Sequence, residues 1–591
     1  MDLRFLNAEP TDAERDAVDA LGTGLGRDLL LPALHAVNDR VGWISQGALN
    51  HICRRLTVPP AEAYGVASFY ALFSLTERPP RVVHVCTDLA CQVNGAEAVC
   101  DALTETVGAA GRPSGGVTWQ RSPCLGVCER APAALAFEAG DPAEERLLAP
   151  VTAAEAVRAA AGTSEMDEAP ISVPQQGEGG LRLLRRVGVV DPESLDAYRA
   201  AGGYAALRNA LLLGPAGVIR EVTDAGLMGR GGAAFPTGRK WDATARQPVR
   251  TRYLVCNADE SEPGTFKDRV LIEGDPFALV ESMTIAAFAI GAQKGYVYLR
   301  GEYPRALRLL RNAIDVAHER GFLGTDIMGH EGFSFDIEVR RGAGAYICGE
   351  ETAIFNSIEG FRGEPRTKPP FPVEKGLFGK PTAVNNVETL VNVPLILTEG
   401  CEAYRRIGTE HSAGPKLFCL SGNVRRPGVY EVPFGTTLDD LLSLAGGVPD
   451  GRELRAILLG GAAGGFVRPD ETGLPLTMED ARAAGATLGS GVVLALDDQA
   501  DLGGFLVRIA AFFRDESCGQ CVPCRIGTVR QEEALHRIVG GKKLSTGGDD
   551  LALLREVGQV MRDSSICGLG QTAWNAIESA IDRLGALEEQ S

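Results

Sequence analysis

The chain has 591 residues, too many for one hydrophobic core, and this length predicts about three to five domains. Hydrophobic residues make up 45% of it, yet no apolar stretch is long enough to span a bilayer, so membrane insertion is not expected. A net charge of −18 without a Lys/Arg block argues against nucleic acid as a partner. Residues 1–5 do not begin a signal peptide, which predicts a cytoplasmic protein whose clustered thiols bind metal.

The first third of the chain changes pattern twice. Residues 1–78 show helical apolar spacing and predict a helical bundle. Residues 79–160 begin with a β run at 81–85, then alternate strands with Ala-rich helices, as in a small α/β domain. Ser, Glu, Pro, Gln and Gly dominate 161–180, which predicts a linker.

The remaining two thirds predict three further regions. Residues 181–415 contain apparent buried strands at 253–256 and 295–299, separated by a helical pattern, and predict a layered α/β domain. Residues 416–500 combine short β runs, Gly-rich turns and one helix, which indicates a small β-rich insert. Residues 501–591 are helical again.

Four cysteines of the C-terminal region have the spacing of an iron–sulfur site. Cys518, Cys521 and Cys524 form a C-x2-C-x2-C run, and Cys567 follows from a later segment. Three sulfurs around one tight turn, with a fourth closing the cage, can hold a cubane cluster. The alternative is zinc, although zinc sites usually pair two C-x2-C knuckles.

A second cysteine quartet lies in the small α/β domain. It consists of Cys86-x4-Cys91, directly after a β run, and Cys124-x3-Cys128. Two pairs in loops at strand ends can hold a two-iron cluster, one iron per pair. Zinc is again the alternative.

The centre of the chain carries a glycine-rich run at 229–240. Such a loop lets the backbone approach a phosphate, and Lys240 would balance the charge. An incidental turn is the alternative, since no strand directly precedes the run. The polar stretches 257–264 and 344–351 offer acids and amides to the hydroxyls of a flavin or dinucleotide, or else form Asx turns and helix N-caps. The run 460–465 is interpreted as turns.

Together these motifs resemble a known family. The stretches 229–241, 257–269, 344–352, 368–372 and 384–389 and the C-terminal cysteine motif are similar to those of the NADH-binding flavoprotein subunit of respiratory complex I. The N-terminal part resembles its thioredoxin-like two-iron subunit, here fused to it. The same modules are similar to those of NAD-reducing hydrogenases and of NAD-dependent molybdenum or tungsten formate dehydrogenases.

The resemblance implies an α/β multidomain fold. Its parts would be the N-terminal helical bundle, a thioredoxin-like ferredoxin domain, a Rossmann-like FMN- and NADH-binding domain, a β-grasp-like insert and a C-terminal helical iron–sulfur domain. The implied cofactors are FMN, NAD(H), a [4Fe-4S] cluster and a [2Fe-2S] cluster.

It also implies which residues bind these cofactors. The adenine of NADH would lie between Phe235 and Phe371, and Glu262 and Glu351, expected as the catalytic residues, would face its hydroxyls and nicotinamide. Ala243 and Ala234 depart from the family, which usually has phenylalanine and glycine there. The other expected cofactor-binding residues are Gly229, Arg230, Gly231, Gly232, Lys240, Asn257, Asp259, Glu260, Ser261, Tyr346, Gly349, Glu350, Val384, Asn385, Asn386 and Thr389.

The implied reaction is hydride exchange between NAD(H) and flavin, with single electrons passing through the C-terminal cluster to or from a partner. That partner would be a large catalytic subunit with further iron–sulfur clusters. The fused arrangement favours the β subunit of a formate dehydrogenase, followed by an NAD-reducing hydrogenase flavoprotein and a fused complex I subunit. A non-catalytic zinc-binding scaffold is the alternative of a different class. The direction of the reaction and the role of the two-iron cluster stay open.

Overall fold

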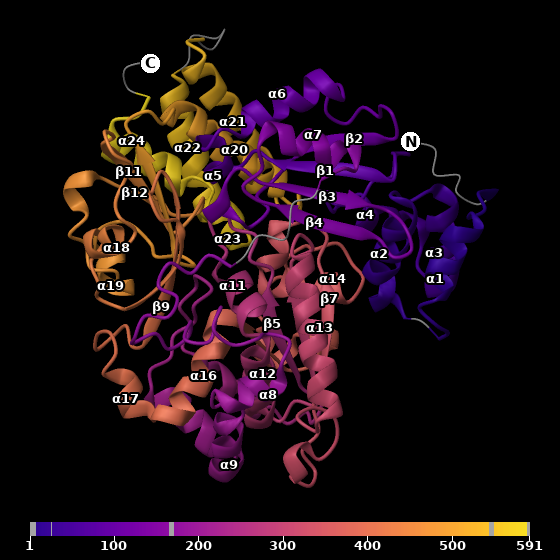
Figure 1. The fold of residues 1–591 in the computed structure, drawn as a ribbon, viewed down its shortest axis with the longest axis vertical. Coiled ribbons are helices and arrows are strands. Elements are labelled where there is room, and N and C mark those ends of the chain that lie inside the picture. Colours follow the sequence, from indigo (N-terminus) through magenta and orange to yellow (C-terminus); the bar gives the residue numbers. More distant parts are fainter. Residues whose placement is uncertain (1–6, 25, 165–170, 543–548, 588–591) are drawn as a thin grey trace.

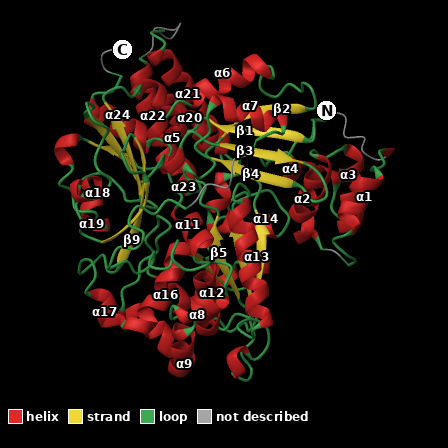
Figure 2. Cartoon of the chain, viewed as in Figure 1, coloured by secondary structure: helices red, strands yellow, loops and turns green. Residues whose placement is uncertain are grey.

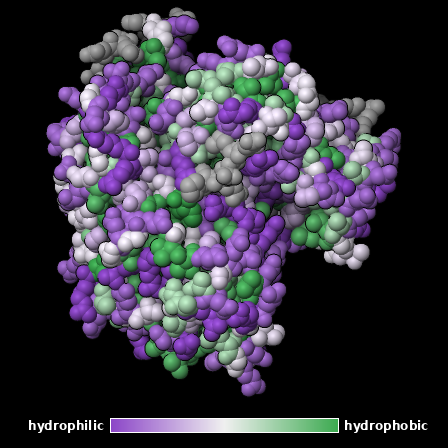
Figure 3. Space-filling view, in the orientation of Figure 1, coloured by the Kyte–Doolittle hydropathy of each residue, from purple (hydrophilic) through white to green (hydrophobic). Residues whose placement is uncertain are grey.

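The computed structural model describes residues 7–24, 26–164, 171–542 and 549–587. Three separate sheets, each flanked by helices, and two mainly helical regions make up this part of the chain (Figures 1 and 2). The multidomain α/β class expected from the sequence is confirmed. The face in Figure 3 is mainly hydrophilic, with hydrophobic side chains in scattered patches. Within the described residues, no helix is long and apolar enough to cross a membrane.

The N-terminal region is a helical bundle followed by a four-stranded sheet. The strand order is β2-β1-β3-β4, with β1 and β2 parallel and the other pairs antiparallel. Helix α1 begins with a capping box between Thr11 and Glu14, and α2 ends at the left-handed Gly42. The elements are α1 (Asp12–Asp19), α2 (Leu30–Val41), α3 (Gln46–Leu56), α4 (Pro60–Ala67), β1 (Arg81–Cys86), α5 (Leu89–Val93), α6 (Ala96–Thr106), β2 (Val117–Ser122), β3 (Ala134–Glu138), β4 (Glu144–Leu148) and α7 (Ala153–Ala161).

Part of the expected linker packs against the β-rich insert. Residues 165–170 lie outside the described part of the chain. Beyond them, the Ser172 carbonyl accepts from the Val429 amide at 3.2 Å, and the Gln175 side chain accepts from the Glu431 amide at 2.8 Å. Both bonds connect the linker to the strand that contains Val429 and Glu431. The second half of the linker is therefore held by contacts that its composition does not predict.

The central region contains a parallel sheet of order β7-β6-β5-β8. Helices cover this sheet, and the carboxyl ends of its strands meet at one edge, where ligands bind in open parallel sheets. The elements are α8 (Leu195–Ala200), α9 (Ala205–Asp224), α10 (Thr237–Ala245), β5 (Tyr253–Ala258), α11 (Lys267–Gly274), α12 (Pro276–Ile290), β6 (Lys294–Leu299), α13 (Pro304–Glu319), β7 (Asp336–Arg341), α14 (Glu351–Ile358), α15 (Pro372–Lys375), β8 (Thr382–Asn386), α16 (Val387–Glu399) and α17 (Cys401–Arg405).

The third sheet has the order β10-β9-β13-β11-β12, with a parallel central pair, β9 and β13, and antiparallel neighbours. It has an apolar cluster of its own. The elements are β9 (Pro415–Gly422), β10 (Gly428–Pro433), α18 (Leu438–Leu444), β11 (Leu454–Leu459), β12 (Gly465–Val467), α19 (Met478–Ala483) and β13 (Val492–Asp497).

The C-terminal region is helical. One hydrophobic cluster connects it with the central domain and the N-terminal bundle. This shared core brings the C-terminal cysteines toward the carboxyl edge of the parallel sheet. The helices are α20 (Leu502–Glu516), α21 (Val522–Val539), α22 (Asp550–Ser564), α23 (Gly568–Thr572) and α24 (Asn575–Leu584).

Candidate functional site

A cavity of about 490 Å³ lies at the carboxyl edge of the parallel sheet. The loops after β5 and β7, the end of β8, the third sheet and helix α23 contribute to its wall. Its volume is in the range of cofactor pockets. Among the residues predicted to bind cofactors, it brings together Gly231, Gly232, Asn257, Asp259, Glu260, Ser261, Glu262, Tyr346, Gly349, Glu350 and Asn386.

The glycine-rich loop folds tightly against the end of β8. A Cβ on Gly231 would lie 3.0 Å from the Cβ of Asn386, so a side chain there would have to push Asn386 back. Gly231 and Gly232 therefore bring bare backbone to the cavity wall, as an anionic or flavin ligand requires. Ala234 has φ +51°, a left-handed conformation that costs an alanine about 1 kcal/mol. The loop therefore holds Ala234 in a strained backbone conformation.

Arg230 points away from the cavity. Its guanidinium is buried and donates to the Tyr404 hydroxyl at 3.1 Å and to the Ala413 carbonyl at 2.7 Å. Its amide donates to the Thr389 hydroxyl at 2.8 Å. The side chains of Arg230 and Thr389, both expected at the cofactor, thus tie the glycine-rich loop to α16, α17 and the segment before the third sheet. They position the loop and do not line the cavity.

Lys240 lies on α10 rather than in the loop where the sequence places it. Its Nζ donates to the Val384 carbonyl at 2.8 Å and lies 3.9 Å from Glu351. Burial lowers the pKa of Lys240, and Glu351 opposes that shift. The neighbouring Asn385 accepts from the Trp241 indole at 2.9 Å, which fixes the end of β8.

Of the four expected dinucleotide residues, Glu262 lines the cavity, whereas Phe235, Phe371 and Glu351 lie outside its lining. Phe235 and Phe371 are 48% and 53% exposed. Lys368 donates to Glu350 at 2.9 Å and to Glu351 at 2.7 Å. The sequence reasoning omitted this lysine as a site residue, although it lies in the quoted motif 368–372. Its single charge bridges the two neighbouring acids at the edge where NADH is expected.

Glu262 lines the cavity, and two hydrogen bonds fix its carboxylate there. It accepts from the Tyr346 hydroxyl at 2.5 Å and from the Ala463 amide at 2.9 Å. Burial raises its pKa to about 7, although both hydrogen bonds favour the charged form. Burial likewise raises the pKa of Asp259 to about 7, against the bond from Ser261 at 2.6 Å. The cavity therefore contains acids that titrate near neutral pH.

The Gly-rich run 460–465 does more than form turns. Gly460 and Ala463 line the cavity, and a Cβ on Gly461 would lie 2.7 Å from Glu262. The absence of side chains lets the third sheet close over Glu262. The glycine pattern could have marked this run as a site of close approach. The sequence alone did not show that it would approach the loop of Glu262.

A buried charge network beneath the cavity was also missed. Lys267 lies 2.8 Å from Asp268 and 3.1 Å from Glu388, and Glu388 lies 2.8 Å from Lys416. Asn386 donates to Asp268 at 2.6 Å. Such a network is costly to break because each buried charge depends on its partner. It fixes the Asn386 amide and joins the third sheet to the cavity floor.

The first cysteine quartet is fully buried. Cys124 and Cys128 have sulfurs 3.3 Å apart, and Cys86 is within hydrogen-bonding reach of Cys91 and Cys124. The bonds with Cys128 and Cys86 lower the pKa of Cys124, whereas the bond with Cys124 raises the pKa of Cys128. Four converging buried thiols in two pairs fit a two-iron cluster.

The second quartet gathers around the N-termini of two helices. Cys521 directly precedes α21 and Cys567 directly precedes α23, positions where the helix dipole favours a thiolate. A Cβ on Gly570 would lie 2.9 Å from the Cβ of Cys524, so glycine allows the two segments to meet. Burial raises the pKa of Cys567 to about 11, and the amides of Leu569 and Gly570 oppose that shift.

Zinc was the alternative for both quartets. Across the described ranges, no three His, Cys, Asp or Glu side chains are grouped so as to hold one metal ion. The pairing of the first quartet and the helix-capping positions of the second fit the multinuclear clusters expected from their spacing.

Four family models match the chain. They are the Nuo51 FMN-binding domain over 222–395, the thioredoxin-like [2Fe-2S] ferredoxin over 24–143, the NADH-ubiquinone oxidoreductase-F iron-sulfur binding region over 504–587 and the SLBB domain over 417–468. The expected cofactors FMN, NAD(H), [2Fe-2S] and [4Fe-4S] are thereby confirmed as those of its domains and family. The ferredoxin model also includes most of the helical bundle.

The chain is similar to several characterised subunits. It is 46% identical over 402 residues to the F subunit of the NADH-quinone oxidoreductase of Aquifex aeolicus (strain VF5), covering 68% of this chain and 92% of that protein. It is 45% identical over 403 residues to the HndC subunit of the NADP-reducing hydrogenase of Solidesulfovibrio fructosivorans, covering 67% and 80%.

A solved structure extends the similarity over nearly the whole chain. A chain of an NAD+-reducing [NiFe]-hydrogenase in the air-oxidized state is 33% identical and has a TM-score of 0.81, covering 98% of this chain and 95% of that one. Domain content, sequence and fold therefore agree. The chain belongs to the family of NADH-dehydrogenase flavoprotein subunits found in complex I and in NAD-reducing hydrogenases, and it is an oxidoreductase.

Proposed function

We propose that this chain exchanges hydride with NAD(H) at the 490 Å³ cavity and single electrons with a partner catalytic subunit through the C-terminal quartet. One observation carries the proposal. Gly568 and Leu569, which directly follow Cys567, line the same cavity as Asn257, Asp259 and Glu262. The cluster ligand and the cofactor cavity thus share a wall, which is the proximity that electron transfer needs.

In this proposal the residues of the chain bind the flavin and orient it. The backbone at Gly229, Gly231 and Gly232 admits the flavin, and the polar groups of Asn257, Asp259, Ser261, Gly349, Glu350 and Asn386 hold its hydroxyls. Bound FMN supplies the chemistry that accepts a hydride and releases electrons singly. No side chain has to act as a general acid or base in the hydride step.

The dinucleotide would enter over the same cavity. Phe235 and Phe371 are exposed aromatic surfaces suited to the adenine. Glu262, oriented by Tyr346 and Ala463, would accept from a dinucleotide hydroxyl or amide. Glu351, paired with Lys368, would lie beside it.

Electrons would leave where the C-terminal quartet reaches the surface. Cys521 and Cys567 are partly exposed, and the adjacent Val522, Ile526 and Ile566 are 59%, 49% and 47% exposed. Exposed apolar side chains gathered around a redox site are typical of a docking surface for a protein partner. The partner proposed here is the subunit that carries the next iron–sulfur cluster.

Two partners are proposed. By analogy, the fusion of the modules with both quartets intact favours a molybdenum or tungsten formate dehydrogenase subunit. The hydrogenase alternative has specific support, because the matching solved chain comes from an NAD+-reducing [NiFe]-hydrogenase and one relative is a hydrogenase subunit. Affinity purification with metal analysis of the co-purifying large subunit separates them. Molybdenum or tungsten would support the first partner, and nickel would support the second.

The proposed cavity is tested through Gly461. Gly461→Ala places a methyl group 2.7 Å from Glu262 and is expected to raise the KM for NADH several-fold in a dye-reduction assay. Gly451→Ala is the matched control, because Gly451 has a similar left-handed φ of +75° and no atom within 4 Å of its Cβ position. Equal KM values in both variants, or purified protein without FMN, would contradict the proposal.

A further inference from the structure

Arg300 connects the flavin cavity with the loop of the two-iron quartet. It follows β6, and its side chain is buried. One terminal nitrogen donates to the Glu260 carbonyl at 2.7 Å, and the other donates to the Cys124 carbonyl. Glu260 lines the cavity, and Cys124 is an expected cluster ligand. A single guanidinium therefore contacts both sites.

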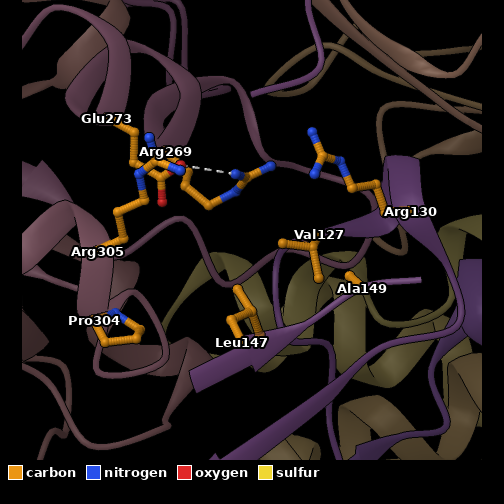
Figure 4. A pocket seen from close by; sticks show the side chains of 8 residues that line it. All are labelled: Val127, Arg130, Leu147, Ala149, Arg269, Glu273, Pro304 and Arg305. Atoms are coloured by element: carbon orange, nitrogen blue, oxygen red, sulfur yellow. Dashed lines mark hydrogen bonds and ion pairs between the residues drawn. The ribbon is translucent and has the colours of Figure 1, made fainter. Parts of the chain in front are cut away.

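Arg269 clamps the same loop from α11. Its Nε donates to the Gly126 carbonyl at 3.0 Å, and its terminal nitrogens pair with Glu129 and, at 3.1 Å, with Glu273. Figure 4 shows the Arg269 side chain extending from beside Glu273 toward Val127. These residues line a hollow of about 20 Å³. That volume suits about one water molecule. The two domains are thus in close contact beside the cluster loop.

The two arginines differ in their charged surroundings. Arg269 lies between two carboxylates, Glu129 and Glu273. Arg130 and Arg305 also act on these carboxylates, so Arg269 belongs to a cluster of paired charges and acts chiefly as a clamp. Arg300 lies closest to Glu302, 3.4 Å from its Nε, and Asp259 and Glu516 are its next acidic neighbours. Of this group, the Arg300 guanidinium is the one that contacts the cluster loop.

We infer that Arg300 is a positioning residue that sets the reduction potential of the two-iron cluster, through a fixed positive charge between that cluster and the flavin cavity. The inference rests on the proposed function, which assigns the cluster to Cys86, Cys91, Cys124 and Cys128. It adds a role for a residue outside the quartet and outside the cofactor motifs.

The sign of the effect follows from charge. One-electron reduction of the cluster by reduced flavin adds one negative charge, and no bond forms or breaks. A guanidinium stays protonated, so it stabilises the reduced cluster at every working pH. Glu302 has the opposite effect. Removing Arg300 therefore lowers the reduction potential, and removing the charge of Glu302 raises it.

The test is a redox titration of the full chain. The electron paramagnetic resonance signal of the reduced two-iron cluster is measured at each potential. For Arg300→Met, the ratio of reduced to oxidised cluster at a fixed potential should fall about tenfold, for a unit charge acting over roughly 10 Å at an effective dielectric constant of about 20. For a one-electron couple, tenfold corresponds to about 59 mV. Glu302→Gln should shift the ratio in the opposite direction.

Two variants separate charge from structure. Arg300→Lys keeps the charge and should shift the ratio much less than Arg300→Met. Arg186→Met removes another arginine of the same domain, 11% exposed and paired with Asp275 at 2.7 Å, and should leave the ratio unchanged. General loosening of the loop cannot produce shifts of opposite sign. Glu302→Gln still tests the inference if Arg300→Met does not fold.

Failure of the inference is distinguishable from failure of the proposed function. A wild-type signal from a two-iron cluster, with no shift in Arg300→Met or with equal shifts in Arg300→Met and Glu302→Gln, overturns the inference alone. A reduced wild-type chain without any two-iron signal overturns the cluster assignment and the inference together.

Discussion

The two cysteine quartets have similar chemistry but very different surroundings. The thiols of Cys86, Cys91, Cys124 and Cys128 are all buried, and two buried arginines of the flavin-binding domain hold their loop. In the C-terminal quartet, Cys521 and Cys567 are partly exposed and adjoin apolar surface. A cluster that reaches the surface is therefore better placed to pass electrons to another protein than one enclosed by the chain.

This contrast assigns different tasks to the clusters. The C-terminal quartet shares a wall with the cofactor cavity on one side and reaches solvent on the other, so it is suited to be the exit. The N-terminal quartet is connected to the cavity through Arg300 and has no exposed thiol. We expect it to act as an internal redox partner of the flavin, and substitutions at each site should have different consequences.

The largest expected difference is in stability. Cys128→Ser empties a site that is buried between two domains, and metal binding contributes directly to folding. We expect the free energy of unfolding of the N-terminal domain to fall by about 3 kcal/mol or more. Cys567→Ser, at an open site with its helices still packed, should cost less. Calorimetry together with iron analysis measures both, and equal losses would remove the contrast.

The next effect concerns docking. Val522→Lys and Ile526→Lys place charges on the apolar surface beside the exposed quartet, so the affinity for the partner subunit should fall at least about tenfold. NADH oxidation by an artificial dye should be unchanged. Leu212→Lys is the matched control, because Leu212 is also exposed but lies on α9, away from both quartets. If the control weakens the complex equally, the docking surface is elsewhere.

A smaller effect is expected at Arg362, which donates to the Cys518 carbonyl at 2.8 Å. This bond parallels that of Arg300 to Cys124, but the Arg362 side chain is 43% exposed. Solvent screens its charge, so Arg362→Gln should lower the potential of the four-iron cluster by less than Arg300→Met lowers that of the two-iron cluster. Redox titrations of both variants compare the shifts, and a larger shift at Arg362 would contradict this account.

A last effect concerns the pH dependence of stability. Burial raises the pKa of Asp259 to about 7 in the folded chain, against about 4 when unfolded. Between these values the folded state binds a proton that the unfolded state has released, so stability falls as pH rises through that window. In flavin-free Asp259→Asn, the urea midpoint should therefore drop less between about pH 4 and pH 7. An unchanged drop would show that Asp259 is ionised throughout.

The sequence predicted what depends on spacing. The cysteine quartets and the polar stretch after β5 are local patterns, and the parallel strands bring Asn257, Asp259 and Glu262 to one edge as their positions require. The strands at 81–86 and 253–258 follow from apolar runs. For these features, short-range chemistry sets the structure.

The contacts that the sequence did not predict depend on long-range packing. The pairing of Lys416 with Glu388 and the direction of Arg230 depend on where the third sheet docks, which no local pattern specifies. The closure of the Gly461 loop over Glu262 and the bond from Arg300 to Cys124 likewise join segments far apart in sequence. These contacts bind domains together, so they could be recognised only in three dimensions.

The most direct test of the exit role is Cys521→Ser, with Cys401→Ser as a control at a partly exposed cysteine outside both quartets. The variant should still oxidise NADH with an artificial dye, because the flavin cavity does not contain Cys521. Electron transfer between NAD(H) and the partner subunit's substrate should be lost. Unchanged turnover of the whole complex would contradict the account and remove the C-terminal quartet from the electron path.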